Sequence, residues 1–191
     1  SQVDSAAFSG HKIGAFKGVG GLFLRPGIKL NLLFAGGGQE RSKRPGTENL
    51  PGIYSLAQRA QELQGVDLNE YWQPARDIKF RLADALQKIE GFVLHSDPEI
   101  CLPNTFHFHM DGVAGDDLLL NLDLGGVQAS SGSACSSGSN RPSHVLKAMG
   151  YDDTAALNSV RLSFLPQYDA SQDVVGRITD TITATVERIR A

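Results

Sequence analysis

Four consecutive residues near the start of the chain, Ser9-Gly10-His11-Lys12, place a hydroxyl, an imidazole and a primary amine in one short segment. A lysine amine becomes a nucleophile toward carbonyl groups when burial or neighbouring charges lower its pKa. Such a lysine can form a Schiff base with pyridoxal phosphate, and the donors before it can hold the cofactor's phosphate. Taken alone, the four residues fit a surface lysine beside a capping serine more simply.

A reactive thiol is the second candidate. Cys135 lies inside a run of ten small residues, 131–140, that has no bulky side chain and predicts a mobile loop. A thiol reacts when it is exposed and ionised, so Cys135 is either a reactive thiol or a tolerated free one. Cys101 stands between Ile100 and Leu102, and we expect it to pack as an inert cysteine.

Glycine-rich backbone occurs at Gly36-Gly37-Gly38, followed by a polar run, 39–49, that contains Thr47. Glycine-rich loops beside a helix start can bind phosphate through backbone N–H groups. The run lacks the Gly-Lys-Ser/Thr ending of a nucleotide-binding P-loop, which excludes that class of site. An anion site and a structural turn both stay open at this point.

Arg161 lies in the segment 159–163, which predicts a half-buried strand. A buried guanidinium needs an anionic partner, because an unpaired buried charge is costly. That partner is either a carboxylate of this chain, which the residues alone favour, or a substrate carboxylate. His107 and His109 resemble a metal-binding pair, but no third ligand follows at suitable spacing, so we expect a packed or solvated face and no metal.

The elements that must position these residues are mixed in type. Helical spacing of apolar residues predicts helices over about 51–63, 75–89, 116–122 and 175–189, and one from Pro142. We expect strands at 18–25 and 28–34, joined at Pro26-Gly27, and at 92–95, 104–110, 127–130 and 159–164. Asn49 is expected to cap the first helix. The interleaving after residue 65 favours an α+β domain preceded by a smaller β segment.

Composition excludes several classes of protein. The chain has 191 residues, a net charge of −3 and a pI of about 5.9, which argues against a general nucleic-acid binder. No apolar run approaches the roughly 20 residues of a membrane span. Residues 1–4 lack a signal-peptide pattern and an initiator Met, so we expect a piece of a longer chain. Two cysteines cannot build a disulfide framework, which favours a cytoplasmic protein.

The order of these motifs resembles that of cysteine desulfurases of the NifS/IscS type, which are pyridoxal-phosphate enzymes. The resemblance spans roughly residues 2–190 and rests on eight ordered motifs: Ser9 to Lys12, Lys17 to Gly20, Gly36 to Arg41, Arg44 to Asn49, Pro103 to Thr105, Ser130 to Gly138, Pro142 to Leu146 and Ser159 to Ser163. It implies an α/β fold, the C-terminal part of a class V, aspartate aminotransferase-like transferase. Residues 1–50 would be the trailing part of the cofactor-binding large domain, and 51–191 a small α+β domain with the cysteine loop.

The resemblance also implies a cofactor site. Lys12 would carry pyridoxal 5'-phosphate as a Schiff base. Its phosphate would be held by Ser9, Gly10 and His11. Thr47 would reach the phosphate of a partner subunit, which implies a homodimer.

Sulfur chemistry is implied at two further residues. Arg161 would bind the carboxylate of L-cysteine. Cys135 would take the sulfur as a persulfide, leave L-alanine, and pass the sulfur to an acceptor protein for iron–sulfur cluster or other sulfur-compound synthesis. The motifs also fit selenocysteine lyases and cysteine or cystine carbon–sulfur lyases, although the cysteine loop favours a desulfurase.

Three departures from the family pattern bear on activity. Phe16 stands where the family usually has Pro, and Phe164 where it usually has Gly. The family's ring-binding half would precede Ser1, so we expect the 191-residue chain alone to be inactive. A non-catalytic fragment that dimerises or docks a sulfur acceptor is the alternative from another class.

Overall fold

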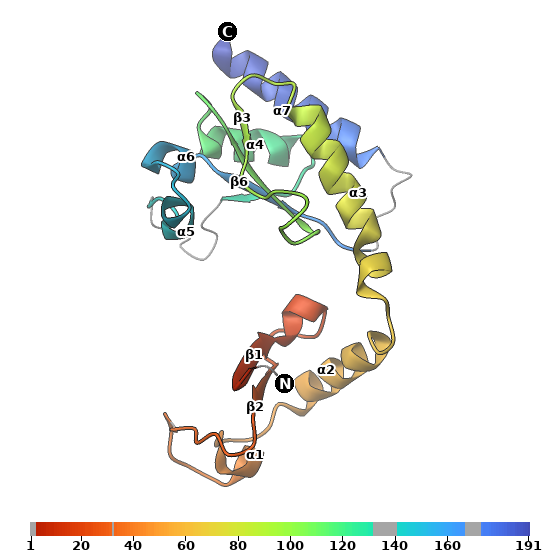
Figure 1. The fold of residues 1–191 in the computed structure, drawn as a ribbon, viewed down its shortest axis with the longest axis vertical. Helices are drawn as coiled ribbons and strands as arrows, with labels where there is room; N and C mark the ends of the chain where they lie inside the picture. Colours follow the sequence, from red (N-terminus) through yellow and green to blue (C-terminus); the bar gives the residue numbers. More distant parts are fainter. Residues whose placement is uncertain (1–2, 32, 132–140, 167–172) are drawn as a thin grey trace. The chain divides into compact units, whose positions relative to one another are not determined.

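The computed structural model describes residues 3–31, 33–131, 141–166 and 173–191. The chain forms two compact units, Ser1–Val66 and Asp67–Ala191, and Figure 1 labels most of their helices and strands. This division lies beyond residue 50, where the sequence placed a domain boundary. Assigning the two parts to a cofactor domain and a small domain stays a prediction. None of the described helices combines the length and the apolar character that crossing a membrane requires.

The first unit is built on a two-stranded antiparallel sheet. Strand β1 (Ser5–Ser9) pairs with β2 (Gly20–Leu24), with Ser9 opposite Gly20. A Cβ at Gly20 would lie 2.4 Å from Phe8 O, so only glycine allows the strands this close an approach. The sequence paired 18–25 with 28–34 instead. That prediction is wrong, because the described residues of 28–34 form no strand.

Two helices complete this unit. Helix α1 (Gln39–Ser42) is a single turn, and α2 (Leu50–Glu62) follows it. Asn49 caps α2 as predicted, because its side chain accepts a hydrogen bond from Gly52 N at 3.2 Å. Between β1 and β2, a short 3-10 helix, η1, covers Gly10–Ile13.

The second unit contains a four-stranded antiparallel sheet of order β3-β4-β6-β5. Its strands are β3 (Phe92–Leu94), β4 (Thr105–Met110), β5 (Ser130–Ser131) and β6 (Val160–Ser163). Three agree with the expected strands, whereas β5 is shorter and later than predicted. On β6, Arg161 lies opposite His107 of β4 and Ser130 of β5.

The helices that the structure describes in this unit are α3 (Leu68–Leu86), α4 (Gly115–Leu124), α5 (His144–Ala148), α6 (Asp153–Leu157) and α7 (Val174–Arg190). Side chains cap most of them, although not α4. Asp67, Asp152 and Asp173 cap α3, α6 and α7 through their carboxylates. Because Asp67 caps α3, that helix starts before residue 75, where apolar spacing alone placed it.

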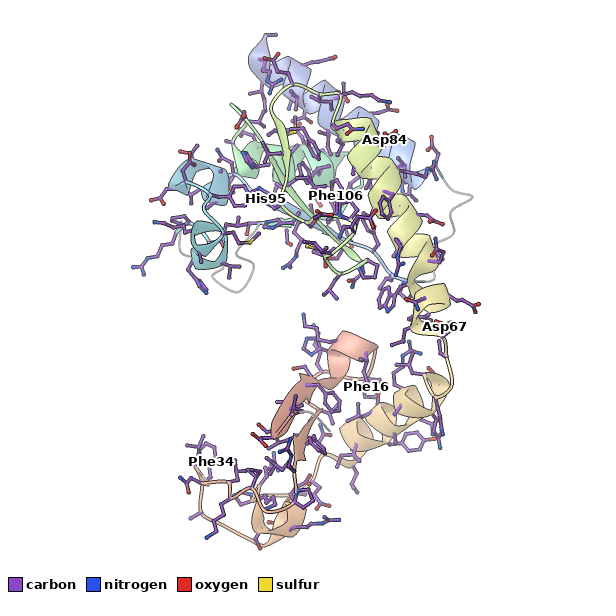
Figure 2. The ribbon with its side chains drawn as sticks, viewed as in Figure 1. Phe16, Phe34, Asp67, Asp84, His95 and Phe106 are labelled. Carbon is purple, nitrogen blue, oxygen red and sulfur yellow. The ribbon has the colours of Figure 1, made fainter. Side chains whose placement is uncertain are left out.

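One apolar core fills the second unit. Phe106, Phe108 and Met110 share one face of β4, as the alternation predicted, and are fully buried. They pack in one cluster with apolar residues of α3, α4 and α7, and α3 and α4 both contact α7. Figure 2 shows Phe106 inside this unit. In the first unit, by contrast, the labelled Phe16 and Phe34 are 64% and 72% exposed.

Candidate functional site

The lysine segment of the first unit is held in a tight turn at the end of β1. Gly10 N donates to Val19 O at 2.8 Å. A Cβ on Gly10 would lie 2.9 Å from the same oxygen, so glycine is required there. Gly14, with φ of +91°, ends η1. These constraints leave His11 and Lys12 exposed on the turn.

Helix α2 is hydrogen-bonded to the same segment. Arg59 Nε donates to Ile13 O at 2.7 Å, and Phe16 N donates to Ser55 Oγ at 3.0 Å. These two bonds join the lysine segment to α2. They explain why α2 belongs to the first unit rather than to the part of the chain that follows.

The groups on this turn fit pyridoxal phosphate. Ser9 makes no side-chain capping bond, and within the described residues the side chains of His11 and Lys12 have no hydrogen-bond partner. A hydroxyl and an imidazole can donate to a phosphate, and a primary amine can condense with an aldehyde. The turn therefore presents groups of the kinds that could hold a phosphate and react with an aldehyde.

Thr47 lies in a loop of the first unit that is tied together by polar contacts. Arg44 Nη1 donates to Thr47 O at 3.3 Å and to Gly46 O at 3.4 Å. Gly46 N donates to Gln39 Oε1 at 3.2 Å. Thr47 itself is exposed, so its hydroxyl is accessible on a braced loop.

In the second unit, Arg161 lies on the wall of a pocket of about 540 Å³. Apolar side chains, including Ile100, Val145 and Met149, form much of the lining. Among the described residues that line it, Arg161 alone carries a full charge. Its Nε is buried without a hydrogen-bond partner, and no described carboxylate pairs with it. The internal ion pair that the residues alone favoured is therefore absent from the described chain.

Two histidines that line the same pocket have pKa values well below the ordinary value. Burial, together with the neighbouring His107 and His109, lowers the pKa of His95 to about 4. Burial, Arg161 and His109 lower the pKa of His107 to about 4. Both side chains line the pocket, and both keep a buried ring nitrogen without a described partner, Nδ1 of His95 and Nε2 of His107.

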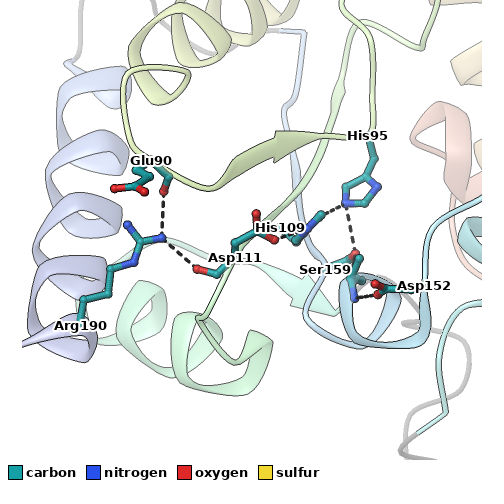
Figure 3. Close-up of polar contacts among 8 residues, drawn as sticks. Glu90, His95, His109, Asp111, Asp152, Ser159 and Arg190 are labelled. Atoms are coloured by element: carbon teal, nitrogen blue, oxygen red, sulfur yellow. Dashed lines mark hydrogen bonds and ion pairs between the residues drawn. The ribbon is translucent and has the colours of Figure 1, made fainter.

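A chain of polar contacts joins His95, His109 and Asp111 (Figure 3). His95 Nε2 lies 2.8 Å from His109 Nδ1, and His109 Nε2 lies 3.3 Å from Asp111 Oδ1. Both imidazoles are buried, whereas the Asp111 side chain is 70% exposed. Asp111 also lines a second pocket of about 350 Å³ together with His109 and Tyr151.

The backbone at Asp111 is held in place by Arg190 of α7 and by Gly91, the residue before β3. Arg190 Nη2 donates to Asp111 O at 2.9 Å and to Glu90 O at 2.8 Å (Figure 3). Asp111 N donates to Gly91 O at 2.8 Å. A Cβ on Gly91, whose φ is +75°, would lie 2.8 Å from Asp111 Cβ and 3.0 Å from Arg190 Nη2. The carboxylate at the outer end of the chain therefore starts from a fixed backbone.

Of the two cysteines, the structure describes only Cys101, and its exposure differs from the prediction. Cys135 lies outside the described residues. Cys101 is exposed, so the prediction that it packs is wrong. Its apolar neighbours Ile100 and Leu102 are themselves 84% and 70% exposed, which is why they give it no cover.

Sequence reasoning missed His95. It follows β3, where its N donates to His107 O at 2.8 Å, so it extends the pairing that brings it beside His107. A polar residue at the end of a predicted strand was the available signal. His107 and His109 lie on a packed face, one of the two arrangements expected. Within the described chain, no three His, Cys, Asp or Glu residues are grouped to hold a metal ion.

Comparison with known proteins gives consistent likenesses. Residues 1–175 match the model of the family described as aminotransferase class-V. A cysteine desulfurase of Gluconacetobacter diazotrophicus is 40% identical over 192 residues, which cover 100% of this chain and 47% of the relative. Cysteine desulfurase IscS 1 of Archaeoglobus fulgidus is 36% identical over 189 residues, covering 99% and 49%. The chain spans about half the length of the curated relatives it matches.

Solved structures show the same likeness. A NifS-like protein matches with a TM-score of 0.78 and 30% identity, over 99% of this chain and 47% of the other. A structure described as SspA in complex with cysteine matches with a TM-score of 0.61 and 28% identity, over 88% and 45%.

Proposed function

Because the chain belongs to the class-V aminotransferase family, we propose that it is part of a cysteine desulfurase, which removes sulfur from L-cysteine and leaves L-alanine. The observation that carries this proposal is the match over 100% of the chain, at 40% identity, to a relative named cysteine desulfurase. The geometry that supports it is a guanidinium without a described carboxylate partner, on the wall of a largely apolar pocket.

The lysine turn is proposed to hold the cofactor. Ser9 and His11 would bind the phosphate through their side chains, Gly10 would let the turn approach it, and Lys12 would supply the amine. Support comes from the accessible, unengaged state of these side chains. When bound, pyridoxal phosphate supplies an electron sink that the protein side chains lack.

Thr47 is proposed to bind the phosphate of a second copy of the chain, which makes the enzyme a homodimer. Its exposed position on a loop that Arg44 and Gln39 brace supports this role. A braced loop presents a hydroxyl to a partner at a lower entropic cost than a free one.

Arg161 is proposed to bind the carboxylate of L-cysteine. A guanidinium is permanently charged and can form two parallel hydrogen bonds with a carboxylate. Support comes from its buried Nε, which has no described partner, and from the neutrality of His95 and His107. With no other charged group on the described wall, the pocket favours an anion at this point.

Cys135 is proposed to receive the sulfur. The carbon–sulfur bond of L-cysteine breaks, a sulfur–sulfur bond forms on the Cys135 thiol, and a proton takes the place of sulfur on the carbon, which gives L-alanine. The sulfur is oxidised as the carbon is reduced, so no external oxidant is needed. The persulfide is then passed to an acceptor protein, for iron–sulfur clusters or other sulfur compounds. A thiol carrier of this kind requires a reducing compartment, so we place the protein in the cytoplasm.

Mass spectrometry tests the proposal. The holoenzyme, isolated with its cofactor, is incubated with L-cysteine, alkylated and digested. We expect the Cys135 peptide to gain the mass of one sulfur atom, and alanine to form. Cys101→Ala is the matched control and should leave this labelling unchanged. If Cys135→Ala still released sulfur at the normal rate, a carbon–sulfur lyase or selenocysteine lyase would replace the desulfurase.

A further inference from the structure

We propose that Lys79 is a positioning residue for the Arg161 pocket. Its side-chain nitrogen hydrogen-bonds to both ends of the segment 97–102, which carries part of the pocket wall, and that wall keeps water away from the guanidinium. In taking Arg161 as the group that binds a carboxylate, the inference rests on the proposed function. In assigning a role to Lys79, on a helix that contributes no described lining residue, it goes beyond that function.

Lys79 occupies a position where a helix of this kind normally has an apolar residue. It lies with four apolar residues on the buried face of α3, and its exposed fraction is 0%. Burial lowers the pKa of its amine, although Cys101 and Asp97 act in the opposite direction. An amine at this position costs free energy that an apolar side chain would not, so its hydrogen bonds are the property to explain.

The nitrogen of Lys79 donates to two backbone carbonyls, one at each end of the segment 97–102. Its Nζ lies 2.9 Å from Leu102 O and 3.4 Å from Asp97 O. The other hydrogen bonds that the structure describes in this segment stay within it or reach Thr105. Among the described hydrogen bonds, those of Lys79 are therefore the ones that join the segment to α3.

Apolar burial does not hold this segment in place. Ile100, Cys101 and Leu102 are all exposed, yet all three line the pocket that contains Arg161. Because these side chains gain little from burial, the position of the wall depends on hydrogen bonds to its backbone. The buried donor on α3 supplies two of them.

The effect reaches Arg161 through water. A guanidinium attracts a carboxylate more strongly where water is excluded, because the effective dielectric constant is lower there. The segment 97–102 contributes part of the apolar lining, and Val145 and Met149 of the α5 region contribute another part. If the segment moves, water enters beside the guanidinium and the carboxylate is held more weakly.

Propionate tests the inference on the full chain, because it has a carboxylate but neither sulfur nor an amine. Nitrogen NMR should show that propionate shifts the Nε signal of Arg161. Lys79→Met removes the donor and keeps an unbranched side chain. It should weaken propionate binding about fivefold, since water enters beside the guanidinium. Lys79→Arg restores a donor and should recover most of the affinity.

Amide hydrogen exchange separates positioning from folding. Lys79→Met should speed exchange at Glu99 N and Cys101 N, which are bonded to Asp97, and should leave exchange in β4 unchanged. The midpoint of urea unfolding should not fall, because an apolar side chain replaces a buried amine. Both carbonyls also keep a backbone partner in this variant.

Two control variants complete the test. Leu82→Ala lowers stability on the same buried face but keeps the donor, and Lys88→Met removes a lysine whose side chain is 73% exposed. Both should leave propionate binding unchanged. Unchanged affinity in Lys79→Met, or equal weakening in Leu82→Ala, would overturn the inference and leave the proposed function intact. A wild-type chain in which propionate leaves Arg161 unshifted would instead contradict the carboxylate role on which both rest.

Discussion

The two units of the chain differ in what supports their functional residues. Of the buried apolar residues described, only Ala15 belongs to the first unit, and the rest lie in the second. The exposed lysine turn is therefore shaped by local hydrogen bonds and glycine geometry, whereas the Arg161 pocket is shaped by a packed core. The second unit therefore places Arg161 in a low-polarity environment, and the first presents its candidate groups at a surface.

Separating the units should give the largest effect. Residues 67–191 alone are expected to unfold cooperatively with heat, because the apolar cluster lies entirely within them. Residues 1–66 alone should show no cooperative transition, since they bury almost no apolar side chain. Calorimetry of the two segments provides the measurement. A cooperative transition in 1–66 would show that the local hydrogen bonds suffice without a core.

Paired leucine substitutions should repeat the contrast on a smaller scale. Leu82 is fully buried and Leu22 is 52% exposed. Leu82→Ala should lower the free energy of unfolding by about 3 kcal/mol, through lost burial and the cavity left behind. Leu22→Ala should cost less than about 0.5 kcal/mol. Urea unfolding followed by circular dichroism compares them, and similar losses would refute the contrast.

Acid should destabilise the second unit through its histidines. Their pKa is lowered from 6.5 to about 4, for His95 by burial, His107 and His109, and for His107 by burial, Arg161 and His109. The unfolded chain then binds more protons between these values. The free energy of unfolding is therefore unaffected by these histidines above pH 6.5. It falls by about 2 kcal/mol or more as the pH drops toward 4. His95→Gln and His107→Gln should each flatten this dependence in urea titrations, and an unchanged slope in both would contradict the assignment.

Helix caps should give the smallest effect. Asp67→Ala removes the cap of α3 and should lower the unfolding free energy of the second unit by about 1 kcal/mol. Asn49→Ala removes the equivalent bond from α2 in the first unit. It should leave the cooperative transition unchanged and only speed amide exchange in α2. Hydrogen exchange with mass spectrometry distinguishes the effects of the two substitutions. A shifted global unfolding transition in Asn49→Ala would show that α2 unfolds together with the apolar core.

Strong periodic patterns predicted the second unit well. The alternation of Phe106, Phe108 and Met110 predicted a strand with one buried face. The structure has that strand and buries all three side chains, so both predictions are confirmed. Patterns failed where burial was absent. Strand β1 has no buried residue, so its side chains show no alternation in burial, and the apolar segment 28–34 suggested a strand that its described residues do not form. Exposure of Cys101 was missed for the same reason, because apolar neighbours in sequence do not ensure cover in space.

The family and its fold were predicted from the order of short motifs, and the match to the class-V aminotransferase model and to a NifS-like structure confirms both. The roles of Lys12, Cys135 and Arg161 stay predictions. The His95 chain had no sequence signal as a whole, because its three members come together only through the pairing of β3 with β4 and the turn after it.

Gly91 limits the order in which substitutions can accumulate. Its left-handed backbone penalises any side chain, and the space a Cβ would need is already taken by Asp111 and Arg190. The guanidinium of Arg190 lies at the end of a flexible side chain and can move aside, whereas the Cβ of Asp111 is fixed to the backbone, so a change at Gly91 depends first on position 111, which is a case of epistasis between two positions distant in sequence. In a library of random variants, replacements at Gly91 should survive chiefly in chains that already carry glycine at position 111.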